Sequence, residues 1–389
     1  MSSVSEYGDS TRSVHEAEGP HGLHEPLVPP IYQCTVFEMD EPEAYESYRD
    51  TPYLRHNNTP TQTAVARKLA GLERAEDALV TPSGMAAIYV VLSAHLKQGD
   101  HLVTFDNLYG GTAKVIADLE RRLGLKVSRL DIRDPASWRG VITPRTRLIY
   151  GETVMNPLLT VCDMEALATL GRETGIPIAV DNTVATPLGL NPIDFGIDFT
   201  IHSASKYLNG HSDIVAGVIT GSSVRLKPLR VAMAEWGVSL DPNSAFLLHR
   251  GLRTFALRFR AQSDNACRMA AWLATQSAVR RVHHPSLTPT AHPLATPPAL
   301  LSFELDCSGP ACEAWMRQCT LARVAPSFGG FATTLCRAMA SSHASVSADA
   351  RKQLGVCDSL IRLSVGIEDV DDLIADFETT LAQLPRLAA

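Results

Sequence analysis

The sequence predicts an α/β fold in which helices cover a mostly parallel β-sheet, followed by a smaller C-terminal α+β unit. Two observations predict it. Between residues 61 and 220, short apolar runs rich in β-branched residues alternate with helical stretches, as in parallel sheets with helical crossovers. After residue 245 the alternation gives way to long helical stretches, a proline-rich connection and a final strand and helix.

The elements follow in order from a polar, proline-punctuated N-terminal segment, which we expect to be an arm. We then expect helix 61–74, strand 78–81, helix 84–97, strand 101–105, helix 111–123, strand 126–131, a short helix after Pro135, strand 146–153, helix 163–174, and strands 176–182, 198–201 and 214–220. The C-terminal unit should hold helices within 244–276, a connection at 285–298, strand 360–366 and helix 369–383. The predicted domains are an arm (1–55), a large domain (56–245) and a C-terminal domain (246–389).

Composition excludes several classes of protein. A formal net charge of −7 argues against a nucleic-acid partner. No apolar run approaches the ~20 residues of a membrane span, and the polar N-terminus lacks the apolar core of a secretory signal. The eight cysteines show no metal-ligand spacing, so we expect reduced thiols, no metal site and a cytoplasmic protein.

A lysine follows one of the expected strands. Lys206, in the stretch SASKYLNGHSD (203–213), lies on a loop between two apolar runs, where its amine would be desolvated. One interpretation is a lysine that extends to the surface from a strand end. The other is an amine with a lowered pKa that bonds to a carbonyl carbon. This stretch alone leaves both open.

Two other strand ends carry polar signals. Ser83-Gly84-Met85 opens a helix after an apolar run, so its free N–H groups suit a phosphate, although an ordinary serine cap explains it as well. Asp181 ends an apolar strand, where a lone carboxylate is costly unless it pairs with a group such as a protonated ring nitrogen, or caps a turn. A phosphate cradle, a carboxylate and a lysine together are what pyridoxal 5′-phosphate requires.

The sequence resembles the Cys/Met-metabolism family of PLP-dependent enzymes, the cystathionine γ-synthase and γ-lyase group of fold-type I transferases. Matching motifs run in order along nearly the whole chain: PPIYQCTVF, YLRHNNTPT, SGMAAI, YGGT, VDNTVATP, HSASKYLNGHSDIVAG, RGLRT, SFGG and DSLIRLSVGIED. The resemblance implies pyridoxal 5′-phosphate as the cofactor, a small amino acid as the substrate, and a homo-oligomer, usually a dimer of dimers.

The resemblance also implies a role for each matching residue. Lys206 would bond to the cofactor aldehyde, and Tyr109 would stack on the ring and help to move protons. The other implied cofactor residues are Asp181 at the pyridine nitrogen, Asn156 at the ring hydroxyl, Thr183 against the ring, the amides of Gly84 and Met85 with Ser203 and Ser205 at the phosphate, and Tyr53 and Arg55 at the phosphate of the neighbouring subunit. Arg362, assisted by Ser327, would bind the substrate carboxylate.

Three stretches depart from the family pattern. The loop at 56–60 is one residue longer than usual, Ala332 stands where the family has a glutamate, and Ala113-Lys114 replaces an Asn-Arg pair. These positions lie where the family recognises the distal part of its substrate. We therefore expect intact cofactor machinery, a substrate other than the housekeeping cystathionine, and a small or weakly polar γ substituent.

The activity inferred from the resemblance is γ-elimination or γ-replacement on a γ-substituted L-amino acid. The YGGT motif resembles the γ branch, whereas Phe328 and the TPT at 59–61, both expected at the rim of the site, resemble the β-lyases, so β-elimination is the alternative. A catalytically idle PLP-fold binding protein is a further alternative, disfavoured by the retention of Lys206, Asp181, Tyr109 and Arg362. An NAD-dependent enzyme is disfavoured because the GxGxxG pattern is absent.

Overall fold

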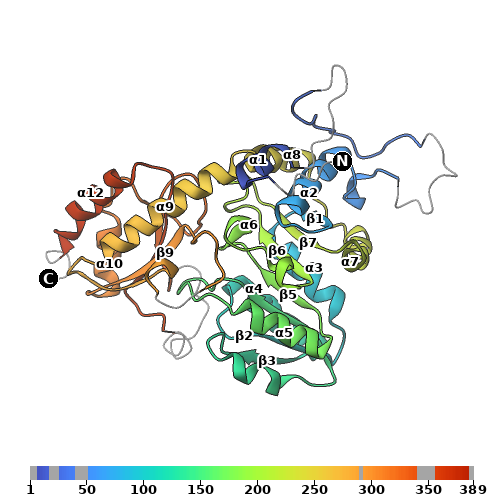
Figure 1. Cartoon of the computed structure of the whole chain (residues 1–389), viewed down its shortest axis with the longest axis horizontal. Coiled ribbons are helices and arrows are strands. Elements are labelled where there is room, and N and C mark those ends of the chain that lie inside the picture. The colour runs from blue at the N-terminus through green and yellow to red at the C-terminus, as the bar shows by residue number, and fades with distance from the viewer. Residues whose placement is uncertain (1–6, 17–25, 40–50, 289–291, 340–354, 385–389) are drawn as a thin grey trace.

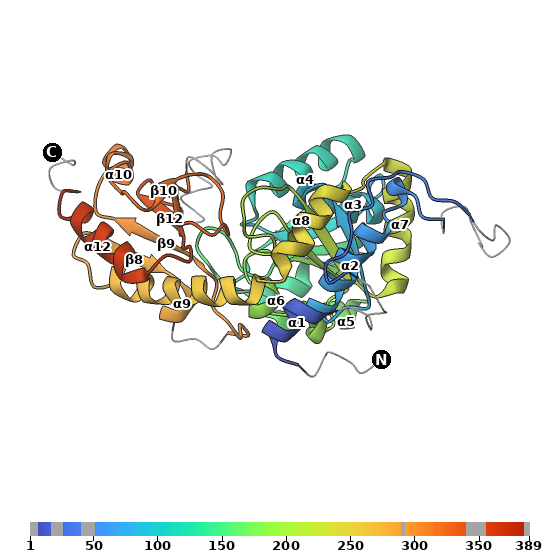
Figure 2. The same ribbon diagram turned by 90° about the horizontal axis from the view of Figure 1, so that it is seen from above.

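Two lobes joined by one long helix make up the molecule. A computed structural model describes residues 7–16, 26–39, 51–288, 292–339 and 355–384 (Figure 1). Helix α9 (Phe255–Leu273) runs from the larger lobe into the smaller C-terminal one, as Figure 2 shows from a second direction. Parts of the predicted N-terminal arm, namely 1–6, 17–25 and 40–50, lie outside the described residues.

A seven-stranded sheet forms the centre of the larger lobe. Its strands are β1 (Asp77–Thr81), β2 (His101–Phe105), β3 (Lys126–Leu130), β4 (Thr146–Glu152), β5 (Ile178–Asp181), β6 (Phe199–Ser203) and β7 (Gly217–Gly221). They lie in the order β1-β7-β6-β5-β4-β2-β3, and neighbours are parallel except at β7, which runs antiparallel to β1 and β6. The prediction of a mostly parallel sheet is confirmed.

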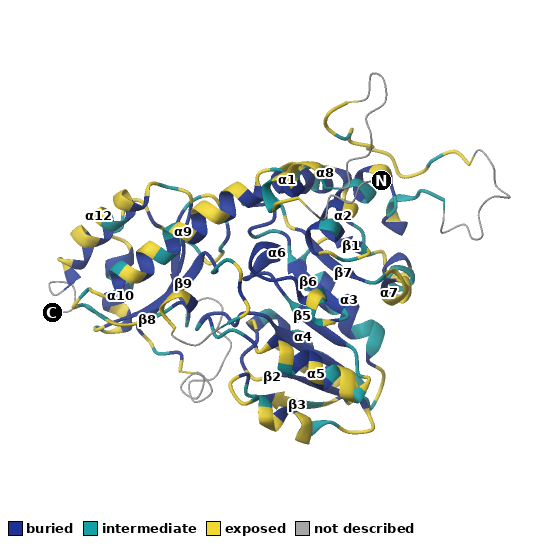
Figure 3. Ribbon diagram, in the orientation of Figure 1, coloured by how far each residue is buried: buried dark blue, intermediate teal, exposed yellow. Residues whose placement is uncertain are grey.

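Helices cover both faces of this sheet, because its strands are apolar on both sides. Along β1, Leu79 packs into the core that includes α3 (Gly84–His95), whereas Ala78 and Val80 point the other way, into the core that includes α2 (Pro60–Leu72). The remaining helices of the lobe are α1 (Asp9–His15), α4 (Gly110–Leu123), α5 (Met164–Thr174), α6 (Thr186–Gly189), α7 (Ser223–Trp236) and α8 (Pro242–Leu252). Figure 3 shows the buried strands and the exposed residues on the outer faces of the helices.

A five-stranded, mostly antiparallel sheet forms the C-terminal lobe. Its strands are β8 (Val279–His283), β9 (Leu300–Leu305), β10 (Arg323–Val324), β11 (Thr334–Arg337) and β12 (Leu360–Ser364), in the order β10-β11-β12-β9-β8. Helices α10 (Gly309–Met316) and α12 (Val370–Leu381) pack on it together with the second half of α9. This is the smaller α+β unit that the sequence predicts.

Helix α9 belongs to both lobes. Near its start, Phe255 and Phe259 lie in the core of the larger lobe, while Met269 and Leu273 near its end lie in the core of the C-terminal lobe. The predicted limit between residues 245 and 246 falls within α8. The division into domains at that point stays a prediction.

The secondary structure departs from the sequence prediction in several places, of which three concern the larger lobe. The strand expected at 214–220 begins only at Gly217, because residues 214–216 continue the loop that contains Lys206. The short helix after Pro135 is a 3₁₀ helix, Pro135–Val141. Helix α7, which contains Pro228, is not among the predicted elements. In the described ranges, no helix combines the length and apolarity needed to cross a membrane.

Candidate active site

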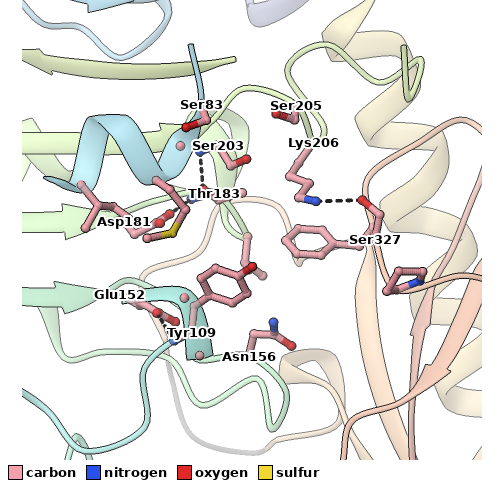
Figure 4. A pocket seen from close by; sticks show the side chains of 18 of the residues that line it. Ser83, Tyr109, Glu152, Asn156, Asp181, Thr183, Ser203, Ser205, Lys206 and Ser327 are labelled. Atoms are coloured by element: carbon pink, nitrogen blue, oxygen red, sulfur yellow. Dashed lines mark hydrogen bonds between the residues drawn. The ribbon is translucent and has the colours of Figure 1, made fainter. Parts of the chain in front are cut away.

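A cavity of about 810 Å³ lies at the carboxyl ends of β4, β5 and β6, where ligands of parallel sheets bind (Figure 4). The C-terminal lobe closes its far side with residues 326–328 and with Arg362 of β12. The predicted site residues that line it are Gly84, Met85, Tyr109, Asn156, Asp181, Thr183, Ser203, Ser205, Lys206, Ser327 and Arg362. The structure thus brings the predicted site residues together in one cavity, apart from Tyr53 and Arg55.

The start of α3 forms an anion cradle in this cavity. Ser83 caps the helix by accepting a hydrogen bond from the N–H of Ala86 at 3.0 Å. In the described part of the chain, the N–H groups of Gly84 and Met85 have no hydrogen-bond acceptor. A Cβ at Gly84 would lie 2.8 Å from the Cα of Ser203, so only glycine lets the helix approach that strand end. Two unpaired N–H groups at a helix N-terminus suit a phosphate.

The ends of β5 and β6 are linked by hydrogen bonds. The N–H of Thr183 donates to Oδ1 of Asp181 at 2.9 Å, and the N–H of Ser203 donates to Oγ1 of Thr183 at 2.8 Å. Burial raises the pKa of Asp181, while the hydrogen bonds from Thr183 lower it. The carboxyl group is therefore fixed in position but lacks a cationic partner among the described residues.

Lys206 extends into the cavity from the turn after β6. Its Nζ donates a hydrogen bond to Oγ of Ser327 at 2.7 Å and lies 5.0 Å from the ring centroid of Phe328. Burial, and to a lesser degree the charge of Arg362, lowers the pKa of Lys206 to about 8. A substantial fraction of the amine is neutral near physiological pH, as attack on a carbonyl carbon requires.

Arg362 is fixed on the C-terminal wall of the cavity. Its Nη2 donates to the carbonyl oxygens of Pro326 at 2.7 Å and Ser327 at 3.2 Å, and its Nη1 lies 3.4 Å from Oδ1 of Asn156. The guanidinium carbon lies 5.3 Å from the ring centroid of Phe328. In the part of the chain that the structure describes, no carboxylate pairs with this cation, so it can bind the carboxylate of a ligand.

Tyr109 lies at the N-terminus of α4 with 43% of its surface exposed. Its backbone N–H donates to Oε1 of Glu152 at 2.6 Å. A Cβ at Gly111 would lie 2.5 Å from Cε1 of Tyr109, so the ring packs closely over the first turn of its own helix. A flat, partly exposed ring at the cavity wall is suited to stack on a planar ligand.

The sequence prediction missed Glu152, which ends β4 and lines the cavity. Burial and the charge of Asp181 raise the pKa of Glu152 to about 8. The signal that identified Asp181, a carboxylate that ends an apolar strand, was present here too. The predicted strand 146–153 extends past Glu152 to Thr153, so this carboxylate does not stand at the predicted strand end.

Tyr53 and Arg55 lie outside this cavity. Nη1 of Arg55 donates to the carbonyl oxygen of Ala234 in α7 at 2.6 Å, and its guanidinium carbon lies 5.3 Å from the ring centroid of Tyr53. In the longer loop after them, Asn57 adopts the left-handed conformation with φ 61°. Contact of Tyr53 and Arg55 with a neighbouring subunit stays a prediction.

The residues that depart from the family pattern are spread over the lobes. Lys114 lines the cavity, whereas Ala113 and Ala332 are not among the residues that line it. Phe328 was expected at the rim. That expectation is wrong, because its ring lies beside both the Lys206 amine and the Arg362 guanidinium.

The groups present in the cavity fit pyridoxal phosphate: an anion cradle, a buried carboxyl without a cationic partner, and an amine with a lowered pKa. The sequence profile of the family described as "Cys/Met metabolism PLP-dependent enzyme" matches residues 10–382. The chain belongs to this family. Like the other members of the Cys/Met metabolism family, it is a PLP-dependent enzyme that acts on amino-acid side chains, and it has the fold-type I architecture.

Members of the family with different activities are about equally similar to the chain. Cystathionine β-lyase of Coxiella burnetii is 34% identical over 380 residues, covering 95% of this chain and 97% of the relative. Cystathionine γ-synthase of Escherichia coli is 36% identical over 365 residues, covering 90% and 92%. The crystal structure of cystathionine γ-lyase from Lactobacillus plantarum complexed with L-serine superposes with a TM-score of 0.91 at 31% identity, covering 97% and 100%.

Proposed function

We propose that this Cys/Met-metabolism enzyme catalyses γ-elimination or γ-replacement on a γ-substituted L-amino acid. The observation that supports it most is the state of the Lys206 amine, whose pKa is lowered to about 8. Among the described residues, Oγ of Ser327 is the one side-chain atom that accepts a hydrogen bond from this amine. γ-Chemistry removes a proton first from Cα and then from Cβ, so it needs a base that moves between them. A long lysine side chain with a near-neutral pKa meets that requirement.

Each side chain of the cavity has a role in this proposal. Bound pyridoxal phosphate supplies the withdrawal of electrons from the substrate Cα. Arg362 holds the substrate carboxylate, and its bonds to the backbone at 326–327 fix the orientation of its fork. Lys206 accepts the Cα proton and then the Cβ proton. Tyr109, which also lines the cavity, receives or returns a proton near the leaving group.

A second candidate, β-elimination, rests on Phe328. The ring of Phe328 contacts the Lys206 amine and the Arg362 guanidinium, and this residue is one of those that resemble the β-lyases. β-Elimination needs only the Cα deprotonation, so the same lysine supports it. We favour the γ reaction because the YGGT motif, which resembles the γ branch, contributes Tyr109, Gly110 and Gly111 to the cavity wall.

An exchange experiment in deuterated water separates the two reactions. The purified enzyme is incubated with a panel of γ- and β-substituted amino acids and with an analogue whose γ substituent cannot leave. A γ-eliminating enzyme should place deuterium at both Cα and Cβ of the non-leaving analogue. From the γ-substituted substrates of the panel it should release a four-carbon keto acid. Exchange at Cα alone, with pyruvate as the only keto product, would decide for the β-lyase.

The same panel tests the proposed substrate class. Ala113 and Ala332 stand where the family pattern has polar residues, so we propose a small or weakly polar γ substituent rather than a second amino-acid moiety, although neither alanine lines the cavity of the single chain. Turnover should be highest with short uncharged γ substituents. Preference for cystathionine over all of them would overturn this part of the proposal.

We also propose that the active unit is at least a two-fold homodimer, in which Tyr53 and Arg55 serve the phosphate of the partner's site. Both residues lie away from the cavity of their own chain, which supports this arrangement. The test mixes inactive Lys206→Ala with inactive Arg55→Ala under conditions that exchange subunits. Hybrid dimers should regain one working site of two, and no recovery after demonstrated exchange would argue against a shared site.

A further inference from the structure

Two carboxyl groups lie side by side at the floor of the cavity. Glu152 and Asp181 are register partners at the carboxyl ends of the adjacent parallel strands β4 and β5, and both line the cavity (Figure 4). Glu152 is only 5% exposed. Two negative charges at neighbouring strand ends repel each other strongly, because little water screens them.

Among the described residues, no ion pair neutralises either carboxyl, although the charge of His202 lowers the pKa of Asp181. In the described ranges, neither carboxyl forms an ion pair with a lysine, arginine or histidine. Asp181 accepts from the N–H of Thr183, and Glu152 accepts from the N–H of Tyr109. The titratable and charged groups around the pair are Tyr150 on β4, His202 on β6, Tyr109 and Lys114 on α4, Lys206 on the loop after β6, and Arg362 on β12.

The nearest of these groups cannot neutralise Glu152. Tyr150 is buried, and burial together with both carboxylates raises its pKa, so it carries no charge. His202 pairs with Oε1 of Glu73 at 2.5 Å, and its charge acts on Asp181 but is not among the groups that shift the pKa of Glu152. Lys206 and Arg362 are held by residues of the C-terminal lobe. A proton on one carboxyl is the remaining way to reduce the repulsion.

We propose that the cofactor-free protein holds one proton on this carboxyl pair, carried by Glu152, and that Glu152 releases it when the cationic ring nitrogen of the cofactor pairs with Asp181. The O–H bond of Glu152 breaks, the proton passes to solvent, and no electron is transferred. Without cofactor, a neutral Glu152 lies beside the Asp181 carboxylate. With cofactor bound, both carboxyls are ionised and the cation of the ring compensates the added charge. Glu152 is thus a positioning residue that matches the charge of the site to the charge of the ring.

The direction of the pKa shifts supports this arrangement. Burial raises the pKa of both carboxyls, and the charge of Asp181 raises that of Glu152 further, to about 8. The inference rests on the proposed pairing of Asp181 with the ring nitrogen. It is independent of which substrate carbon loses its substituent.

Calorimetry of cofactor binding tests the proposal. Pyridoxal phosphate is titrated into Lys206→Ala, which cannot bond to the aldehyde, in two buffers of different ionisation enthalpy, and the difference gives the number of protons released. With a pKa of about 8, Glu152 carries about 0.9 proton at pH 7 and about 0.03 at pH 9.5. Lys206→Ala should release about 0.9 more protons than Lys206→Ala/Glu152→Gln at pH 7, and the two should agree at pH 9.5. The exposed Glu165→Gln serves as the matched control.

Equal proton release by both proteins at pH 7 would overturn the proposal. A second measurement avoids any change at position 152. Infrared difference spectra of Lys206→Ala, labelled with ¹³C-carboxyl glutamate, should lose the C=O band of a protonated glutamic acid when pyridoxal phosphate binds. If no such band is lost, Glu152 does not release a proton. Because both assays measure binding alone, their failure is distinct from failure of the proposed γ reaction.

Discussion

Replacement of Gly84 by alanine tests the anion cradle most directly. A Cβ at this position would lie 2.7 Å from Cβ and 2.8 Å from Cα of Ser203, whereas ordinary contacts begin at 3.4 Å. The helix and the strand end must therefore move apart by about 0.6 Å. That movement separates the N–H groups of Gly84 and Met85 from Ser203, which together form the cradle.

The size of the effect follows from the cost of overpacking. Forcing a methyl group into a filled site costs about 1–3 kcal/mol. If the cradle must return to its original geometry to hold the phosphate, this cost opposes binding, and the affinity for pyridoxal phosphate should fall roughly 5- to 150-fold. Absorbance titration of the cofactor-free protein measures the dissociation constant.

Two alanine substitutions serve as controls. A Cβ at Gly140 meets nothing within 4 Å, so Gly140→Ala should leave the affinity unchanged. A Cβ at Gly221 would lie 2.6 Å from the backbone oxygen of Asp198, so Gly221→Ala overpacks the same lobe away from the cavity and controls for lost stability. The reasoning would be refuted if Gly84→Ala bound the cofactor as tightly as the wild type. It would also be refuted if Gly221→Ala, at a similar melting temperature, lost as much affinity as Gly84→Ala.

Two further predictions concern the amine of Lys206. In cofactor-free protein at pH 8, Lys206 should react with an amine reagent on the order of tenfold faster than an ordinary lysine. A pKa of about 8 leaves half of the amine neutral while a pKa of 10.5 leaves about 0.3% neutral, and the lower nucleophilicity of the less basic amine offsets part of this gain. Peptide mapping with the exposed Lys126 as the internal standard measures this, and equal rates would contradict the lowered pKa. Ser327→Ala should lower the pKa of Lys206 further, because the hydrogen bond that Nζ donates to Ser327 stabilises the ammonium form. The midpoint of the labelling rate against pH should then move down, and an unchanged or higher midpoint would mean that Ser327 does not stabilise the charged amine.

Strand-end residues were predictable from the sequence because the rule for them is local. Asp181 and Lys206 each follow an apolar strand, and the carboxyl ends of parallel strands share one edge of the sheet. The same rule applies to Glu152 but was not used there. Its partner is set by the register of β4 against β5, which no single segment encodes.

Features that depend on how distant segments pack were not predictable. Strand β7 runs antiparallel to both of its neighbours. Its residues do not predict this direction, because a buried strand is apolar whether its neighbours are parallel or antiparallel. Phe328 was misplaced because its contacts with Lys206 and Arg362 depend on how the C-terminal lobe docks on the larger one. The predicted contacts of Tyr53 and Arg55 with a second chain depend on groups that lie outside a single chain.

The continuity of α9 has a mechanical consequence for substrate selection. A helix of 19 residues is about 28 Å long and stiff, and its two ends are anchored in separate cores. Near its middle, Nε2 of Gln262 donates to the carbonyl oxygen of Gly330 at 2.6 Å, which braces the segment carrying Ser327 and Phe328. Bending one lobe against the other at this point would require breaking backbone hydrogen bonds of α9. We therefore expect the span between the walls to change little, so that the length of a substrate decides how well it fits the cavity.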